Sequence, residues 1–146
     1  MPKEFNNLGI SFLYPDNWTV EEDDSSDDGP QVTVFSPNTA FWVVSVHPPS
    51  TEPEHLAMAA VEVMKDEYEG LEIAPAAEKI ADHSTTGYDL NFYCENLTNT
   101  ARVRCLRANR ATLAFFCQAE DRELPQVEQV FQAIMVSLLG RLDEAD

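Results

Sequence analysis

The residues best suited to binding a partner lie in the centre of the chain. Arg102 and Arg104 are two residues apart in a segment with the alternating pattern of a β-strand, so both side chains should lie on one face of a sheet. Leu106 continues their row, and regular pairing of neighbouring strands would add Tyr93 and Phe116 to the same face. Arginine and tyrosine beside exposed aromatic surface are typical of a protein-binding patch. We therefore predict a partner-binding surface at these five positions.

A structural role for the same residues is the competing interpretation. The first helix of the chain could cover this face, in which case Leu106 and Phe116 belong to the core. Arg102 and Arg104 would then neutralise the many acidic residues of that helix. The next candidate for a binding site would be the groove between the sheet and the first helix. The sequence leaves both interpretations open.

An acidic run offers a candidate for a cation site. Asp24, Ser26, Asp28 and Gly29 match positions one, three, five and six of an EF-hand loop. Position twelve is Phe35, where a bidentate glutamate is needed, and strand patterns flank the run, so a solvated loop is favoured over Ca²⁺ binding. Millimolar Ca²⁺ should leave the melting temperature nearly unchanged. A rise of several degrees that matched NaCl does not produce would contradict this.

The sequence lacks the residue arrangements typical of catalysis or of a zinc site. Asp82, His83 and Ser84 are the residue types of a hydrolytic triad, but neighbours along an extended chain point to opposite faces. His47 and His55 lie on other segments without zinc-ligand spacing, and we expect the histidines at the surface. Neither a nucleophile elbow nor a glycine-rich phosphate loop is present. The sequence favours a protein that is not an enzyme and that has no cofactor or metal.

The charge balance narrows the choice of partner. The formal net charge is −17, and residues 83–119 are the exception, with four arginines against two acids. Such a surface repels nucleic-acid phosphates and anionic lipid and favours basic or neutral partners. No segment approaches the ~20 apolar residues of a membrane span, and none resembles a signal peptide. We expect an acidic, cytoplasmic protein, although a chain from which a leader had been removed would look the same.

The apolar periodicity predicts an antiparallel sheet with helices packed on it, an α+β domain that spans residues 1–146. Strands are predicted at 10–14, 18–20, 32–35, 41–46, 71–81, 88–95, 101–107 and 112–119. Segment 71–81 should lie at an edge, because Pro75 interrupts it. The first helix should begin at Thr51, which has capping-box spacing to Glu54, and end at Gly70. A second helix should cover the sheet with the stripe Val127, Val130, Phe131, Ile134, Met135 and Leu138.

Three cysteines fall on the predicted strands. Cys94, Cys105 and Cys117 alternate in phase with apolar residues, so we place all three on one buried face. The apolar residues in question are Leu90, Phe92, Val103, Leu113 and Phe115. An odd number of cysteines without CxxC spacing favours reduced thiols, with a Cys94–Cys105 disulfide as the minor alternative.

Several short motifs together resemble the PsbP/Mog superfamily. They are Gly9-Ile10-Ser11-Phe12-Leu13-Tyr14-Pro15 with Trp18, Val34-Phe35-Ser36-Pro37, Val44-Ser45-Val46 and Phe131-x-x-Ile134-x-x-Ser137-Leu138. The resemblance covers nearly the whole chain, in the right order. It implies an α/β/α sandwich around an antiparallel sheet. The matched positions are turn and core residues, so the resemblance implies no functional residue.

The same resemblance implies a non-enzymatic accessory protein. The superfamily includes photosystem subunits, a Ran GTPase-binding protein and bacterial chaperones for type VI secretion effectors. We therefore expect the chain to bind another protein. The sharpest form of this expectation is a secretion-effector chaperone whose sheet holds an apolar helix of its client in a groove. An acidic Ca²⁺-responsive domain and an enzyme with no recognisable motif are the alternatives.

Overall fold

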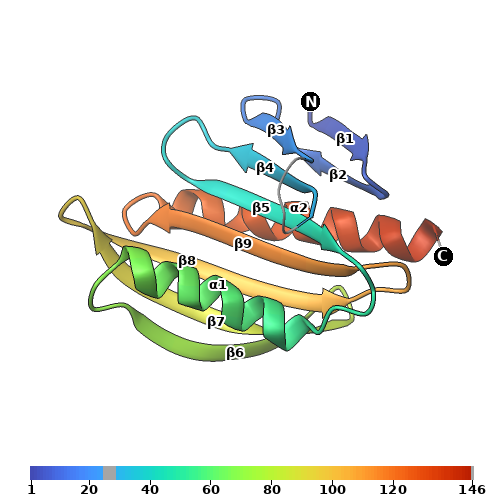
Figure 1. Cartoon of the computed structure of the whole chain (residues 1–146). Helices are drawn as coiled ribbons and strands as arrows, with labels where there is room; N and C mark the ends of the chain where they lie inside the picture. The colour runs from blue at the N-terminus through green and yellow to red at the C-terminus, as the bar shows by residue number, and fades with distance from the viewer. Residues whose placement is uncertain (25–28, 146) are drawn as a thin grey trace.

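Seven strands form one antiparallel sheet between two helices (Figure 1). The computed structural model describes residues 1–24 and 29–145. In spatial order the strands are β3 (Thr19–Asp23), β4 (Gln31–Phe35), β5 (Phe41–His47), β9 (Thr112–Glu120), β8 (Leu97–Arg107), β7 (His83–Cys94) and β6 (Glu72–Ile80). A separate hairpin consists of β1 (Lys3–Asn7) and β2 (Ile10–Tyr14), and the helices are α1 (Pro53–Glu67) and α2 (Leu124–Ala145). The predicted α+β sandwich with an antiparallel sheet is confirmed.

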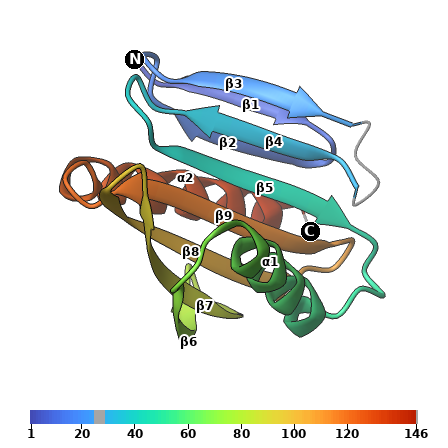
Figure 2. The same ribbon diagram turned by 60° about the vertical axis from the view of Figure 1, so that its left-hand side comes forward.

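The strand register assigns each central residue to one of two faces. Arg102 lies opposite Cys117, and Val103 lies opposite Phe116. Directly opposed side chains of an antiparallel pair point to the same side of the sheet. Arg102 and Cys117 therefore share one face, and Val103 and Phe116 share the other. We call these the α2 face and the α1 face, after the helix that packs on each (Figure 2).

The α2 face is covered by α2 and by the β1–β2 hairpin, which lie side by side (Figure 2). The ring of Phe12 stacks on Phe5 with centroids 5.0 Å apart and meets Trp42 of β5 edge-on at 5.2 Å. The backbone N–H of Leu13 donates to Ser137 Oγ at 2.8 Å, which ties the hairpin to α2. The predicted helical stripe packs into this core, with Val127, Phe131, Ile134, Met135 and Leu138 buried and Val130 partly buried.

The α1 face is covered by α1 over part of its width. The buried residues of the helix are Ala57, Val61 and Met64. Glu52 is the N-cap and makes no side-chain capping bond, so the predicted capping box of Thr51 and Glu54 is wrong. Pro53 begins the helix instead, because its fixed φ suits the first turn. The Thr112 hydroxyl donates to the carbonyl of Thr51 at 2.8 Å, which anchors the start of α1 on β9.

Two strands illustrate where local pattern succeeds and fails. The sequence does not predict β1, because Phe5 is its one buried residue and leaves no alternation to detect. The edge position of β6 is confirmed, with Pro75 on a strand that pairs with β7 alone. No helix among the described residues is long and apolar enough to cross a bilayer.

The three cysteines do not share a face, which corrects the prediction. The β8–β9 connection, residues 108–111, has an even number of residues, so odd positions of β8 oppose even positions of β9. Cys105 therefore lies on the α1 face with Cys94, whereas Cys117 lies on the α2 face with Arg102. All three thiols are free, so the alternative of a Cys94–Cys105 disulfide is excluded.

Candidate functional site

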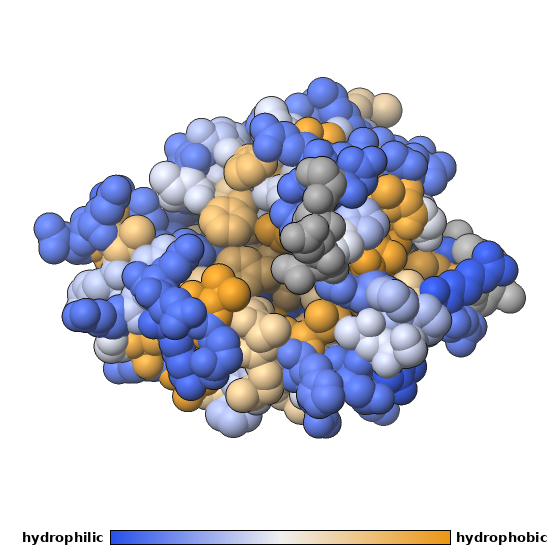
Figure 3. Space-filling view, viewed as in Figure 1, coloured by the Kyte–Doolittle hydropathy of each residue, from blue (hydrophilic) through white to orange (hydrophobic). Residues whose placement is uncertain are grey.

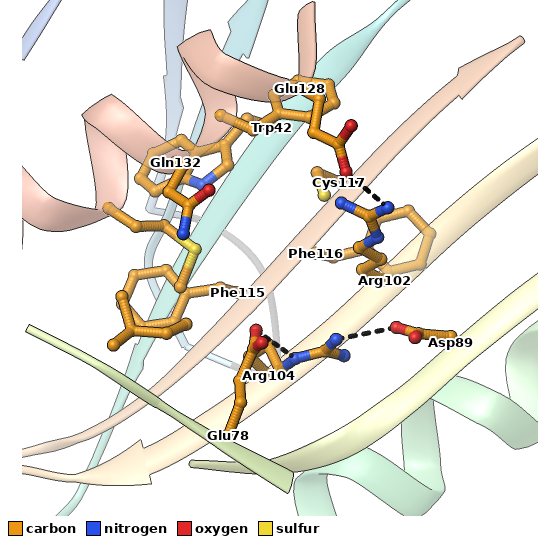
Figure 4. Close-up of a pocket in the computed structure, with 13 residues that line it drawn as sticks. Trp42, Glu78, Asp89, Arg102, Arg104, Phe115, Phe116, Cys117, Glu128 and Gln132 are labelled. Atoms are coloured by element: carbon orange, nitrogen blue, oxygen red, sulfur yellow. Dashed lines mark hydrogen bonds and ion pairs between the residues drawn. The ribbon is translucent and has the colours of Figure 1, made fainter. Parts of the chain in front are cut away.

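Arg104 is held within the structure by two carboxylates (Figure 4). Its Nε donates to Glu78 Oε1 at 2.9 Å, its Nη2 to Asp89 Oδ1 at 2.7 Å, and its Nη1 to the carbonyl of Val103 at 2.9 Å. Burial by itself lowers the pKa of Arg104, but the hydrogen bonds and charges of Asp89 and Glu78 outweigh it, so the pKa is raised. Arg104 is 6% exposed and remains charged.

Arg102 connects the sheet to α2. Its Nη2 lies 2.8 Å from Glu128 Oε1 (Figure 4). A cavity of about 290 Å³ lies between the ion pairs and α2, lined among others by Cys117 and Gln132. Both arginines thus neutralise acids of the chain itself, as the structural interpretation expects. The acids come from β6, β7 and α2, however, and not from the first helix.

The structure assembles part of the predicted binding patch. Arg102 and Arg104 lie in one row with Leu106 on the α2 face. Leu106 is buried in the core, and Phe116 points to the α1 face, which corrects the patch at these two positions. Tyr93 lies on the α2 face and is 71% exposed. Partner binding through the remaining surface stays a prediction.

The structure also corrects the placement of one histidine. His47 is buried, and its Nε2 lies 2.8 Å from Ser45 Oγ, whereas His55 is exposed as predicted. No group of three His, Cys, Asp or Glu side chains that could hold a metal occurs in residues 1–24 and 29–145. Two of the EF-hand-like positions, Ser26 and Asp28, lie outside the described residues.

The thiols should react slowly in the native protein. Burial raises the pKa of Cys105 and of Cys117 to about 12. The thiolate is the reactive species, and with such a pKa about one thiol in 10⁵ is ionised at pH 7. Titration with a chromogenic disulfide reagent should therefore detect no more than one fast thiol in the native protein and three after denaturation. Rapid modification of two or more native thiols would contradict the burial of these side chains.

An apolar groove opens beside α1 on the α1 face (Figure 3). α1 packs over β7, β8 and β9, and within residues 1–24 and 29–145 no helix packs to a similar extent on β4 and β5 on this side. The resulting groove has a volume of about 570 Å³. Its floor includes Phe41, Val43 and Phe116 from the sheet, and its wall includes Leu56, Ala60 and Val63 from α1. In Figure 3 apolar surface is visible in the middle of this face, beside hydrophilic surface on its left.

The groove forms because β5 is apolar on both of its faces. Trp42 is buried on the α2 face, while Phe41 and Val43 are half-buried on the α1 face. The ring centroid of Phe41 lies 5.9 Å from that of Phe116, which extends an aromatic surface onto β9. On the α1 wall Val63 is 59% exposed. A contiguous apolar surface left open in this way indicates an interaction site.

The two ends of the groove are polar. His47 lies opposite Thr112, which bonds the start of α1, so His47 and Ser45 mark one end. Gln118 and Tyr68 mark the other end, where α1 stops. Burial raises the pKa of Tyr68, with a further contribution from Cys94, so the phenol stays neutral. Of the described residues that line the groove, none is Lys or Arg.

Sequence reasoning identified the groove as a second candidate without finding its residues. The signal was present in β5, where Phe41-Trp42-Val43-Val44 shows no alternation, as expected of a strand with apolar surface on both sides. Ala59 and Val63 also widen the apolar stripe of α1 beyond the width that one sheet contact needs. Both signals were readable from the sequence.

Comparisons with known proteins place the fold. No family model matches the sequence, and no curated protein matches it. A crystal structure from Bacteroides thetaiotaomicron is similar over 93% of this chain, with a TM-score of 0.62 and 13% identity, and the chain spans 47% of that protein. The PsbP protein CyanoP of Synechocystis is similar over 93% of this chain and 90% of its own, with a TM-score of 0.62 and 14% identity. A variant of the protein Mog1 is similar over 99% of this chain and 92% of its own, with a TM-score of 0.53 and 10% identity.

These likenesses confirm the fold that the sequence motifs imply. CyanoP is a PsbP protein, and Mog1 gives the PsbP/Mog superfamily the second half of its name. The chain is similar in structure to both over nearly their full length. At such low identity the comparison concerns the fold alone. The chain therefore has a PsbP/Mog fold, and its function has to be argued from its own surface.

Proposed function

We propose that the chain is a non-enzymatic accessory protein that binds an apolar helix of another protein in the groove beside α1. The observation that carries the proposal is the uncovered apolar floor at Phe41, Val43 and Phe116. Apolar side chains on one sheet face are normally covered by a further layer. A partner helix would form that layer over the part of the sheet that α1 does not cover.

The dimensions of the uncovered region suit one helix. An α-helix is about 10 Å across with its side chains, and neighbouring strands are about 4.8 Å apart, so one helix covers about two strands. The bare strands beside α1 are β4 and β5. The groove runs along α1, whose 15 residues correspond to a helix about 22 Å long. A partner segment of similar length would bind by helix-in-groove recognition.

The finer role that we propose is that of a chaperone for a secreted effector. An apolar helix aggregates when it is exposed in water, and a groove that covers one side of it reduces this exposure. The PsbP/Mog resemblance supports the role, because that superfamily includes effector chaperones. On the opposite face the buried Arg104 is held by ion pairs with Glu78 and Asp89, which gives that face a structural function and leaves the α1 face for the client.

A defined apolar segment tests the proposal. A 15-residue helix of leucine and alanine, fused to a soluble carrier protein, should form a soluble complex with the chain when the two are co-produced and separated by gel filtration. Val63→Asp places a carboxylate against the bound segment and should weaken the complex by about tenfold or more, because an unpaired charge would be buried.

The matched control is Val136→Asp on α2. Val136 is 45% exposed on the opposite side of the sheet, so this variant has the same change in charge without touching the groove. We expect it to bind the segment as the wild type does. Equal loss of binding in both variants, or no complex with the wild-type chain, would contradict the proposal.

A further inference from the structure

We infer that the cavity between the sheet and α2 binds a small uncharged aromatic molecule that carries a carbonyl oxygen. The cavity has a volume of about 290 Å³ and lies on the α2 face, on the other side of the sheet from the groove. The inference therefore does not depend on the helix that we propose to bind beside α1. A pocket with apolar walls and a few convergent polar groups is the usual form of a small-molecule site.

The inner wall of the cavity contains a hydrogen-bond donor without an acceptor. Trp42 of β5 is fully buried, and its Nε1–H finds no acceptor within residues 1–24 and 29–145. In Figure 4 its indole lies across the cavity from Arg102 and Arg104. A buried donor that stays unpaired is unfavourable, and a ligand that brings an acceptor to it removes this cost. The donor therefore selects a ligand with an acceptor, such as a carbonyl oxygen.

Gln132 of α2 controls access to this donor. Figure 4 shows its carboxamide near the indole of Trp42. Gln132 is exposed, and its side chain makes no hydrogen bond in the part of the chain that the structure describes. Exposed side chains change rotamer within nanoseconds. Rotation of Gln132 away from the indole gives a ligand a path from solvent to Trp42 Nε1.

The walls of the cavity suit an aromatic ring. The ring centroids of Trp42 and Phe115 lie 5.9 Å apart, and Phe131 and Met135 of α2 add to the apolar lining. Opposite them lies the guanidinium of Arg102, a planar group that stacks on aromatic faces. A cavity of about 150 Å³ is enough for benzene. This larger cavity therefore has room for one ring with a carbonyl substituent.

The charges around the cavity favour an uncharged ligand. Two arginines line it against three carboxylates, those of Glu78, Asp89 and Glu128. Both arginines are already paired with these acids at 2.7–2.9 Å, so an anion would have to displace a carboxylate from its arginine. The excess negative charge also repels an anion. An ammonium group, in turn, offers Trp42 no acceptor.

Three probes that share a benzene ring test the inference: acetophenone, ethylbenzene and benzoate. Amide NMR follows the indole N–H resonances of Trp42 and of Trp18, which does not line the cavity. Acetophenone should move the Trp42 resonance downfield in a saturable titration, because its oxygen accepts from Nε1, and should leave the Trp18 resonance in place. Ethylbenzene lacks the oxygen and should cause no downfield shift. Benzoate should bind about tenfold or more weakly than acetophenone, because the excess carboxylate repels it.

A pair of matched variants locates the site. Gln132→Phe fills the entrance of the cavity and should weaken acetophenone binding by about tenfold or more, since a close-packed ring leaves no room for a second one. Gln129→Phe is the same change at an exposed position of α2 that does not line the cavity, and it should bind as the wild type does. No shift of the Trp42 resonance with acetophenone, or equal weakening by both variants, would overturn the site. Benzoate binding as tightly as acetophenone would overturn the uncharged class of ligand.

Discussion

Replacing Arg102 and Arg104 by glutamate should destabilise the protein by about 4 kcal/mol, which is a large part of the stability of a small domain. Arg104 is buried and bonded to Glu78 and Asp89 at 2.9 and 2.7 Å, and Arg102 is bonded to Glu128 at 2.8 Å. The double variant would place two further carboxylates beside these three acids. Urea unfolding followed by fluorescence measures the difference in free energy of unfolding.

Arg107→Glu with Arg110→Glu is the matched control. It produces the same change in net charge, but both side chains are exposed, and the ion pair of Arg107 with Glu52 is at the surface. Exposed pairs contribute little, so this variant should unfold within about 1 kcal/mol of the wild type. If the Arg102 and Arg104 variant were as stable as this control, the two arginines would be available to a partner. The predicted binding patch on the α2 face would then be supported.

Replacing Gly87 by alanine should destabilise the protein by about 3 kcal/mol or more, a large effect for a single methyl group. A Cβ atom at this position would lie 1.8 Å from the backbone oxygen of Val103 and 3.1 Å from the Cα of Arg104. Because those atoms belong to the backbone of β8, the clash cannot be relieved by a side-chain rotation. Relief requires β7 and β8 to separate beneath the guanidinium of Arg104.

Gly140→Ala is the same chemical change, but we expect it to cause no loss of stability. Gly140 lies in α2, and a Cβ there meets nothing within 4 Å. Alanine is favoured over glycine in a helix by about 1 kcal/mol, so this variant should be as stable as the wild type or slightly more stable. A small effect of Gly87→Ala would mean that the β7–β8 pair is looser than the structure has it.

The fold was largely predictable because its strands and helices have strong local patterns. The stripe of α2 and the edge strand β6 follow directly from the spacing of apolar residues and from Pro75. The assignment of faces was not predictable to the same degree. It depends on the register of each pair of strands. If the turn also included Thr112, so that Arg107 paired with Leu113, Phe116 and Cys117 would exchange faces.

The candidate site was harder to predict for a related reason. Arg102 and Arg104 attracted attention because charge is conspicuous in a sequence, yet Glu78 and Glu128, which neutralise them, lie 26 positions away in both directions and could not be paired with them by spacing. The groove is made of ordinary apolar residues such as Val43 and Val63. From the sequence such residues are expected in the core, and only the structure shows that no helix or strand of the described residues covers them.

The measurement that tests the groove most directly is methyl NMR of the chain during titration with the 15-residue Leu/Ala segment on its carrier protein. We expect the largest chemical-shift changes at the methyl groups of Val43, Leu56 and Val63, which line the groove. The methyl groups of Met135 and Val136, on α2 at the other side of the sheet, should stay nearly unchanged. Largest changes at Met135 and Val136, with Val43 and Val63 unaffected, would contradict binding in the groove.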